Sequence, residues 1–189
     1  WDYALDDRNV LVLDRADGVL KQNEHSILQF QAEEILHIDD KVRKALHYPL
    51  RSGEALQAWA DRQDQADTAQ ELTLSYRFSV EQLPQADMQL ALEQPANWQI
   101  SLNGRPLPNT ASGWWVDPAI QTIDVPAALL STGINVLKLT GQFHKQTDLE
   151  ALYLLGPFGV KTDGRSSSLI SLPDYLQPGN IVTQGLPFY

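Results

Sequence analysis

Cysteine is absent from this chain of 189 residues, and methionine occurs once, at Met88. The lack of cysteine excludes disulfide bonds, cysteine-ligated zinc and thiol catalysis. Basic residues are also scarce, since 14 Lys and Arg stand against 24 Asp and Glu, for a formal net charge of −10. No run of Lys or Arg occurs, so we expect neither nucleic acid nor an anionic membrane as a partner.

Several sequence motifs of known enzyme classes are missing as well. The four histidines show neither His-x3-His nor His-Glu-x-x-His spacing, so no catalytic metal is expected. No nucleophile elbow, phosphate loop or dinucleotide-binding glycine motif occurs, and no cofactor is expected. No Asn-x-Ser/Thr acceptor site is present.

The acidic residues do not form a recognisable catalytic pair. Glycoside hydrolysis needs two positioned carboxyl groups, and the sequence does not report their separation. Glu33-Glu34 and Asp39-Asp40 are interpreted as solvated faces of a helix. The polar loop around Asp61, Asp64 and Asp67 lacks the Gly and the final Glu of an EF-hand, so structural Ca²⁺ is only a minor alternative.

One main helix is predicted in the N-terminal part, near residues 38–46. Apolar residues recur there at helical spacing, at Ile35, Ile38, Val42 and Leu46. Asp39 or Asp40 is expected to cap its start, and Pro49 to end it.

The rest of the chain has the period-two pattern of β-strands. The clearest case is 72–80, where Leu, Leu, Tyr, Phe and Val alternate with polar residues. Further strands are predicted at 9–14, 88–92, 98–102, 114–117, 122–125, 135–143, 151–155 and around Val160. Asn103-Gly104 predicts a type I′ hairpin turn. Seven or more strands with short turns and almost no helix indicate a mainly β sandwich or jelly roll.

One β-sandwich domain is therefore expected over residues 1–189. It comprises a first strand and helical segment (1–68), a jelly-roll core (69–165) and a wrapping tail (166–189). The chain begins at Trp1 without a signal-peptide pattern, so we expect a segment of a larger protein. We also expect the sandwich to lack its last strand or two after Tyr189.

Three segments carry a resemblance to a known family. Residues 98–108 read WQISLNGRPLP, residues 113–117 read GWWVD, and residues 123–139 read IDVPAALLSTGINVLKL. Together they resemble the sugar-binding-type domain of family 2 glycoside hydrolases, a galactose-binding-like jelly-roll β-sandwich. Its recurring phrases are Leu-Asn-Gly, an aromatic-Asp strand, and Leu-x-x-Gly-x-Asn-x-Leu-x-Leu, in that order.

The wider frame resembles a narrower group. NVLVLD at 9–14, YLLGPFG at 153–159 and QGLPFY at 184–189 are similar to the carboxy-terminal region of large bacterial α-L-rhamnosidase-like proteins. This resemblance implies a non-catalytic accessory domain that packs on, or assists, a catalytic domain in carbohydrate degradation. The alternatives are an independent carbohydrate-binding module and a catalytic glycosidase fragment. A periplasmic or extracellular bacterial location is favoured.

If the domain binds sugar, the site is expected around Gly113, Trp114, Trp115 and Asp117, with His144 at its rim. Adjacent Trp residues in a strand point to opposite faces, and an exposed indole is a platform for a sugar ring. Gly113 lets the backbone approach a ligand, and Asp117 supplies an acceptor on the face of Trp115. The competing interpretations are core or domain-contact packing for the Trp residues, a turn role for Asp117, and a solvent-facing loop position for His144.

Overall fold

The computed structural model describes residues 1–51, 69–162 and 166–187. In chain order the elements are β1 (Asn9–Leu13), β2 (Arg15–Gln22), β3 (His25–Glu34), α1 (Ile35–Ala45), β4 (Gln70–Val80), β5 (Met88–Glu93), η1 (Pro95–Asn97), β6 (Trp98–Leu102), β7 (Arg105–Pro106), β8 (Gly113–Trp115), β9 (Asp117–Val125), η2 (Ala127–Leu129), β10 (Gly133–Phe143), β11 (Leu152–Gly156), β12 (Gly159–Thr162), β13 (Ser167–Ile170) and η3 (Val182–Gln184).

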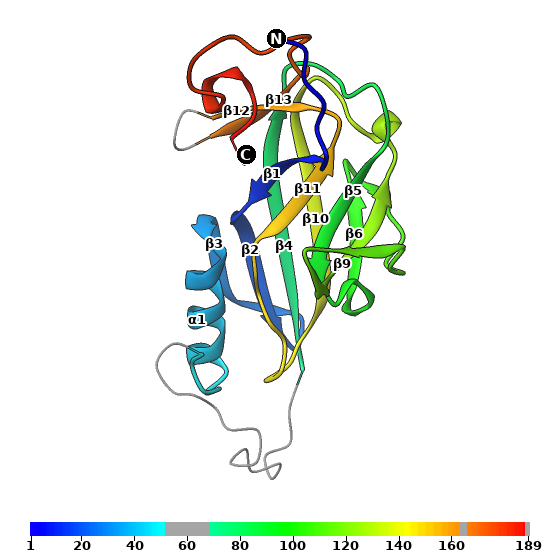
Figure 1. Cartoon of the computed structure of the whole chain (residues 1–189). Helices are drawn as coiled ribbons and strands as arrows, with labels where there is room; N and C mark the ends of the chain where they lie inside the picture. Colours follow the sequence, from blue (N-terminus) through cyan, green and yellow to red (C-terminus); the bar gives the residue numbers. More distant parts are fainter. Residues whose placement is uncertain (52–68, 163–165, 188–189) are drawn as a thin grey trace.

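The described strands form two sheets that face each other (Figure 1). The five-stranded sheet has the order β1-β11-β5-β9-β8. The eight-stranded sheet has the path β12-β13-β4-β10-β6-β7, and β2 joins β4 with β3 beside it. All pairings are antiparallel except a short parallel one between β13 and β4. The predicted mainly β sandwich with one main helix is confirmed at this level.

The core lies between the two sheets and follows the alternation seen in the sequence. Along β4 the apolar side chains of Leu72, Leu74, Tyr76, Phe78 and Val80 are buried, as predicted, while the residues between them are partly or fully exposed. The inward residues of β5, β6, β9, β10 and β11 complete the same cluster. Strands such as β4 and β6 bury every second residue, whereas β1, β5 and β11 also bury outward residues in a second, smaller apolar cluster.

A hairpin formed by β2 and β3 was not predicted. Asn23 and Glu24 reverse the chain with φ values of 50° and 67°, both in the left-handed region that a type I′ turn requires. Most of β3 is exposed, and Phe30 is its one fully buried residue. The alternation of buried and exposed residues that would reveal β3 is therefore weak. In β2, the pair Asp17-Gly18 resembles a turn when it is read from the sequence alone.

The start of α1 differs from the prediction. The residue before the helix is Glu34, and its side chain makes no capping hydrogen bond. The first helical N–H, that of Ile35, donates to the carbonyl oxygen of Asp14 at 2.8 Å, so the β1–β2 junction satisfies it. The prediction that Asp39 or Asp40 caps the helix was wrong, and Asp39 is not on a solvated face, because it is 5% exposed and pairs with Arg43.

The end of α1 is set before Pro49 is reached. His47 has φ of 58°, and its N–H donates to the carbonyl of Lys44, while the N–H of Tyr48 donates to the carbonyl of Arg43. These two bonds are those of a Schellman motif, which satisfies the last helical carbonyls. The helix therefore ends through this left-handed residue, two positions earlier than the proline predicts.

Two asparagines join the turn after β6 to the start of β10. The Nδ2 of Asn103 donates to the carbonyl of Leu129 at 2.9 Å and to Oδ1 of Asn135 at 2.7 Å, and its Oδ1 accepts from the N–H of Val136. Asn135 is fully buried and bonds Ser131 through both its Oδ1 and its Nδ2. These hydrogen bonds give the Asn-Gly and Gly-x-Asn motifs of the sequence a structural role in this fold.

Removal of this asparagine pair is expected to destabilise the fold. Asn135→Ala leaves the main chain around Ser131 and the amide of Asn103 without buried partners, so the free energy of unfolding should fall by about 1–3 kcal/mol. Asn97→Ala, which removes only an exposed bond to Gln94, should change it by less than about 0.5 kcal/mol. Urea unfolding measures both, and equal effects of the two substitutions would contradict this role.

Candidate functional site

The predicted sugar site falls on a tight hairpin between β8 and β9. The strand predicted at 114–117 is wrong in its course, because the chain reverses at Val116, which has φ of 62°. Trp115 and Asp117 are paired across this turn instead of following each other along one strand. The carboxylate of Asp117 accepts the N–H of Ala119 at 2.8 Å, so it holds the turn, as its alternative interpretation stated.

Trp115 packs on the outer face of the five-stranded sheet. Its ring centroid lies 5.1 Å from that of Tyr153 on β11, at an interplanar angle of 50°. Val12 and Ile120 lie against the same cluster, whose buried floor is formed by Val10, Ala91 and Leu155. We call Val12, Trp115, Ile120 and Tyr153 the aromatic platform. Its two rings are partly exposed and, tilted by 50° to each other, form an apolar surface on this sheet face.

The neighbours of Trp115 have different surroundings. Trp114 is 61% exposed and is paired with Gln121, whereas the apolar cluster includes Trp115. Gly113 is paired with Thr122, and a Cβ at Gly113 would come within 3.2 Å of the Thr122 hydroxyl. Trp115 is therefore the packed residue of the pair, and it packs on the outer face of the sheet, not in the core between the two sheets.

A row of polar side chains borders the aromatic platform. Nη1 of Arg8 donates to Oε1 of Gln89 at 2.6 Å, and Nε2 of Gln89 donates to Oδ1 of Asp124 at 3.1 Å. The hydroxyl of Ser112 donates to the same carboxylate oxygen at 3.1 Å. Gln89 precedes Ala91 by two residues on β5, so this row lies directly beside the platform on one face.

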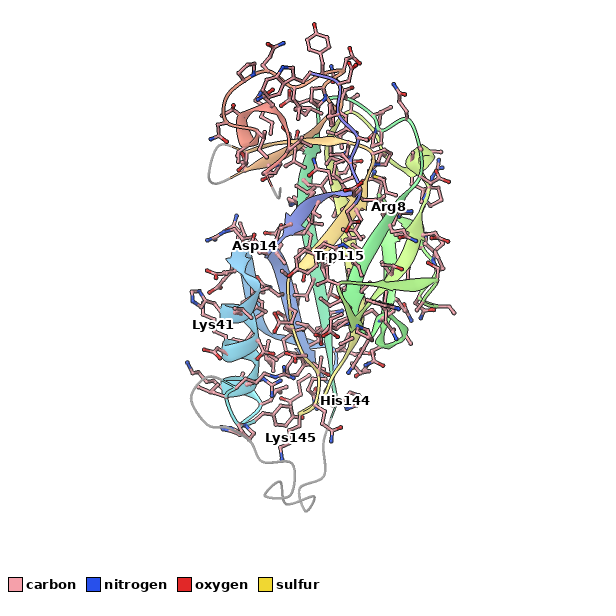
Figure 2. The ribbon with its side chains drawn as sticks, in the orientation of Figure 1. Arg8, Asp14, Lys41, Trp115, His144 and Lys145 are labelled. Atoms are coloured by element: carbon pink, nitrogen blue, oxygen red, sulfur yellow. The ribbon has the colours of Figure 1, made fainter. Side chains whose placement is uncertain are left out.

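His144 does not belong to this site. It follows β10 in an exposed loop, and its N–H donates to the hydroxyl of Thr147 at 2.8 Å. Figure 2 shows His144 and Lys145 at the lower end of the molecule, away from Trp115. The structure thus brings together Gly113, Trp114, Trp115 and Asp117 in one hairpin and leaves His144 apart.

The loop that carries His144 is fixed by a buried arginine of α1. Nε of Arg43 donates to Oδ2 of Asp39 at 2.6 Å, and its terminal nitrogens donate to the carbonyls of Lys145 and Thr147 at 2.9 and 2.5 Å. The guanidinium also lies 5.5 Å from the ring centroid of Phe143. Burial raises the pKa of Asp39 despite its bond to Arg43. This contact attaches the helix to the loop between β10 and β11.

A second charged group lies beside this contact. Arg51 forms an ion pair with Asp148 and donates to the carbonyl of Thr147 at 3.0 Å. Burial, and next the charge of Glu93, raise the pKa of Glu150. Glu93, Asp148 and Glu150 line one small recess of about 20 Å³, so a test for catalysis targets Glu150.

Sequence reasoning missed most of the surface around Trp115. Tyr153 lies between the buried residues Leu152 and Leu154, and this alternation is a signal that could assign it to an outer face. Nothing in the sequence, however, indicates that β11 lies near the β8–β9 hairpin. The bordering residues Arg8 and Asp124 lie far apart in the chain. Their approach depends on the strand order of the sheet, which local patterns do not encode.

Comparison of the chain with family models, with curated proteins and with solved structures finds no match. Among the residues that the structure describes, no group of three or more His, Asp or Glu side chains is placed to hold a metal ion. The loop around Asp61, considered for Ca²⁺, lies outside the described residues. No helix within the described ranges is long and apolar enough to cross a membrane.

The buried arginine is expected to matter for stability. Arg43→Ala removes this donor from Asp39 and from the carbonyl of Lys145, and leaves the carbonyl of Thr147 with Arg51 alone, so the free energy of unfolding should fall by about 3–5 kcal/mol. Lys44→Ala, an exposed neighbour on the same helix, serves as the control and should stay within about 0.5 kcal/mol. Denaturant unfolding measures both, and a loss for Arg43→Ala as small as the control would refute the contact's importance.

Proposed function

We propose that this chain is a non-catalytic accessory β-sandwich domain of a bacterial glycoside hydrolase of the α-L-rhamnosidase-like kind. In this proposal it contacts a catalytic domain through the outer face of its five-stranded sheet. The observation that carries the proposal is the aromatic platform, where Trp115 and Tyr153 cover a floor of buried apolar residues on that face. Aromatic residues beside an arginine are typical of the centre of domain and protein contacts.

The sequence resemblance supports the same proposal from another direction. The phrases shared with the sugar-binding-type domains of family 2 glycoside hydrolases include Asn103 and Asn135, and here these two residues bond each other at 2.7 Å. Their role is to fix a loop at one end of a two-sheet sandwich. Because the role of this shared sequence motif is structural, it supports a common galactose-binding-like jelly-roll fold. It gives less support to a common chemistry.

The charged groups also favour a scaffold. Asp17 has both carboxylate oxygens in hydrogen bonds, to the N–H of Ala32 and to Arg77, and Asp39 is tied to the buried Arg43. These groups hold elements of the fold together. Glu150 is exposed beside a recess of about 20 Å³, which is too small for a sugar ring, so the proposal includes no catalysis at that residue.

A carbohydrate-binding module is the second candidate, and one specific observation favours it. The aromatic platform is bordered by the Arg8, Gln89 and Asp124 row, which offers donors and an acceptor next to an aromatic ring. Sugar sites combine an apolar ring face with a few placed polar groups in this manner. In that case Trp115 supplies the stacking face, and Tyr153 extends it.

The isolated chain is expected to hydrolyse no aryl glycoside, including the α-L-rhamnoside. The measurement is chromophore release from a panel of aryl glycosides. Turnover that is lost in Glu150→Gln, but kept in Glu71→Gln, would overturn the non-catalytic proposal, because Glu71 is a carboxylate paired with Lys21 on another part of the fold.

The aromatic platform is expected to bind the remaining domains of the parent polypeptide when the two parts are produced separately. Trp115→Arg should abolish this association, since a charge replaces the central ring. Trp114→Arg is the matched control and should leave the association intact. Analytical gel filtration of the mixed parts measures it. Persistent association in Trp115→Arg contradicts this surface.

A sugar titration separates the second candidate from the first. If the platform is a carbohydrate site, rhamnosides or oligosaccharides should change the tryptophan fluorescence with a Kd in the millimolar range, which corresponds to about −4 kcal/mol. The change should vanish in Trp115→Ala and remain in Trp114→Ala. Absence of any binding favours domain packing.

A further inference from the structure

One edge of strand β4 is interrupted. Its other edge pairs with β10 along its whole length, from Gln70 to Val80. On the interrupted edge, β2 pairs with β4 up to Ser75, and β13 pairs with it at Ser79 and Val80 alone. Within the described residues, positions 76–78 therefore have no strand partner on this side. In Figure 1, β13 crosses the upper part of β4, β2 runs along the lower part, and β1 ends between them.

A cleft of about 260 Å³ opens at this interruption. The cleft is lined by the end of β1, the start of β2, the middle of β4 and the residues at the start of β13, together with Ala32 of β3 and Ile134 of β10. Its volume lies just below the range of about 300–1,000 Å³ that is typical of clefts enclosing drug-sized ligands. The cleft therefore suits a ligand with a single ring.

Arg77 is held in position at the cleft by Asp17. Nε of Arg77 donates to Oδ2 of Asp17 at 2.8 Å, and Oδ1 of Asp17 accepts the N–H of Ala32 at 2.9 Å. Arg15 donates to the carbonyl of Ala32 at 3.1 Å and stiffens the same corner. Both oxygens of Asp17 are thus occupied. The two terminal nitrogens of Arg77 have no hydrogen-bond partner in the part of the chain that the structure describes, and they remain available as donors.

The other polar groups of the cleft complement these donors. Ser75 and Ser79 alternate with Arg77 along β4 and so share its face, and each hydroxyl can donate and accept. The exposed carboxylate of Asp14 can only accept. Two arginines and two aspartates line the cleft, so its side chains carry no net charge. The exposed side chain of Ile134 adds an apolar wall.

We propose that this cleft binds a neutral, polyhydroxylated molecule of the size of one monosaccharide. Adjacent hydroxyls of such a ligand each donate and accept, which matches the guanidinium of Arg77, the hydroxyls of Ser75 and Ser79, and the carboxylate of Asp14. Because the two arginines and two aspartates balance, a charged ligand gains no net electrostatic attraction from the lining of the cleft. The ligand class follows from the polar side chains of the cleft and does not rest on the function proposed for the aromatic platform. Val12 borders both surfaces, but Asp14, Ser75 and Arg77 belong to the cleft alone.

The test is an NMR titration of the ¹⁵N-labelled chain with L-rhamnose, D-galactose and D-glucose. At least one of these sugars should shift the amide signals of residues 13–17 and 75–79, with a Kd in the millimolar range. Arg77→Ala should weaken binding by about tenfold or more, because a hydrogen bond to a charged group is lost. Lys138→Ala is the matched control, since Lys138 is an exposed cation opposite Ser75 on β10 and does not line the cleft.

Further variants keep the outcome unambiguous. Asp17→Asn should also weaken binding, because it releases Arg77, while the rest of the spectrum shows an intact fold. Trp115→Ala should leave the cleft shifts unchanged. The proposal is overturned if no sugar shifts these amides, if the shifts persist in Arg77→Ala, or if D-glucuronate or D-glucosamine binds more tightly than the neutral sugars. Shifts that centre on Trp115 and vanish in Trp115→Ala would support the carbohydrate-binding candidate above and overturn the cleft.

Discussion

The antiparallel pairing of β4 with β10 is the constraint on which the rest of this molecule depends. The two strands match over eleven residues each, from the pair Gly133–Val80 to the pair Phe143–Gln70. One end of this ladder delivers Asn135 to the loop that it fixes, and the other delivers Phe143 to the guanidinium of Arg43. A shift of one residue in this register would exchange buried and exposed faces along both strands. The contact with the helix and the two end loops therefore depend on one ladder.

The two ends of the sandwich are stabilised by different physics. At the Asn135 end, neutral amides satisfy main-chain groups, and no charge is buried. At the α1 end, a guanidinium is removed from water, and its cost is offset by one carboxylate and several carbonyl oxygens. Oδ1 of Asp39 has no hydrogen-bond partner among the described residues, so this compensation is incomplete. The stability of the α1 end therefore depends more strongly on each hydrogen-bond partner than that of the Asn135 end does.

The sequence predicted the parts of the fold that are encoded locally. Alternation along 72–80, the Asn103-Gly104 turn and the apolar spacing of α1 all identified their elements correctly. The hairpin of β2 and β3 escaped because β3 buries little more than Phe30, so it has almost no apolar period. The reversal at Val116 escaped because a β-branched residue rarely adopts a positive φ. Trp115 was identified as a site residue from its type, but its partner Tyr153 is brought to it by strand order, which one sequence without relatives does not reveal.

The short parallel pairing of β13 with β4 has a consequence for how the molecule opens. Two matched residues attach β13 to β4, and the N–H groups of Glu81 and Gln82 also donate to the carbonyl of Leu169. The carbonyl of Gly185 holds β12, because it accepts from the N–H of Val160 and from Asn9. Val160 and Leu169 both lie in the main core cluster. Opening of the β12–β13 hairpin therefore exposes part of the core to water, so this wall of the β4 edge is coupled to the two-sheet core and does not open independently of it.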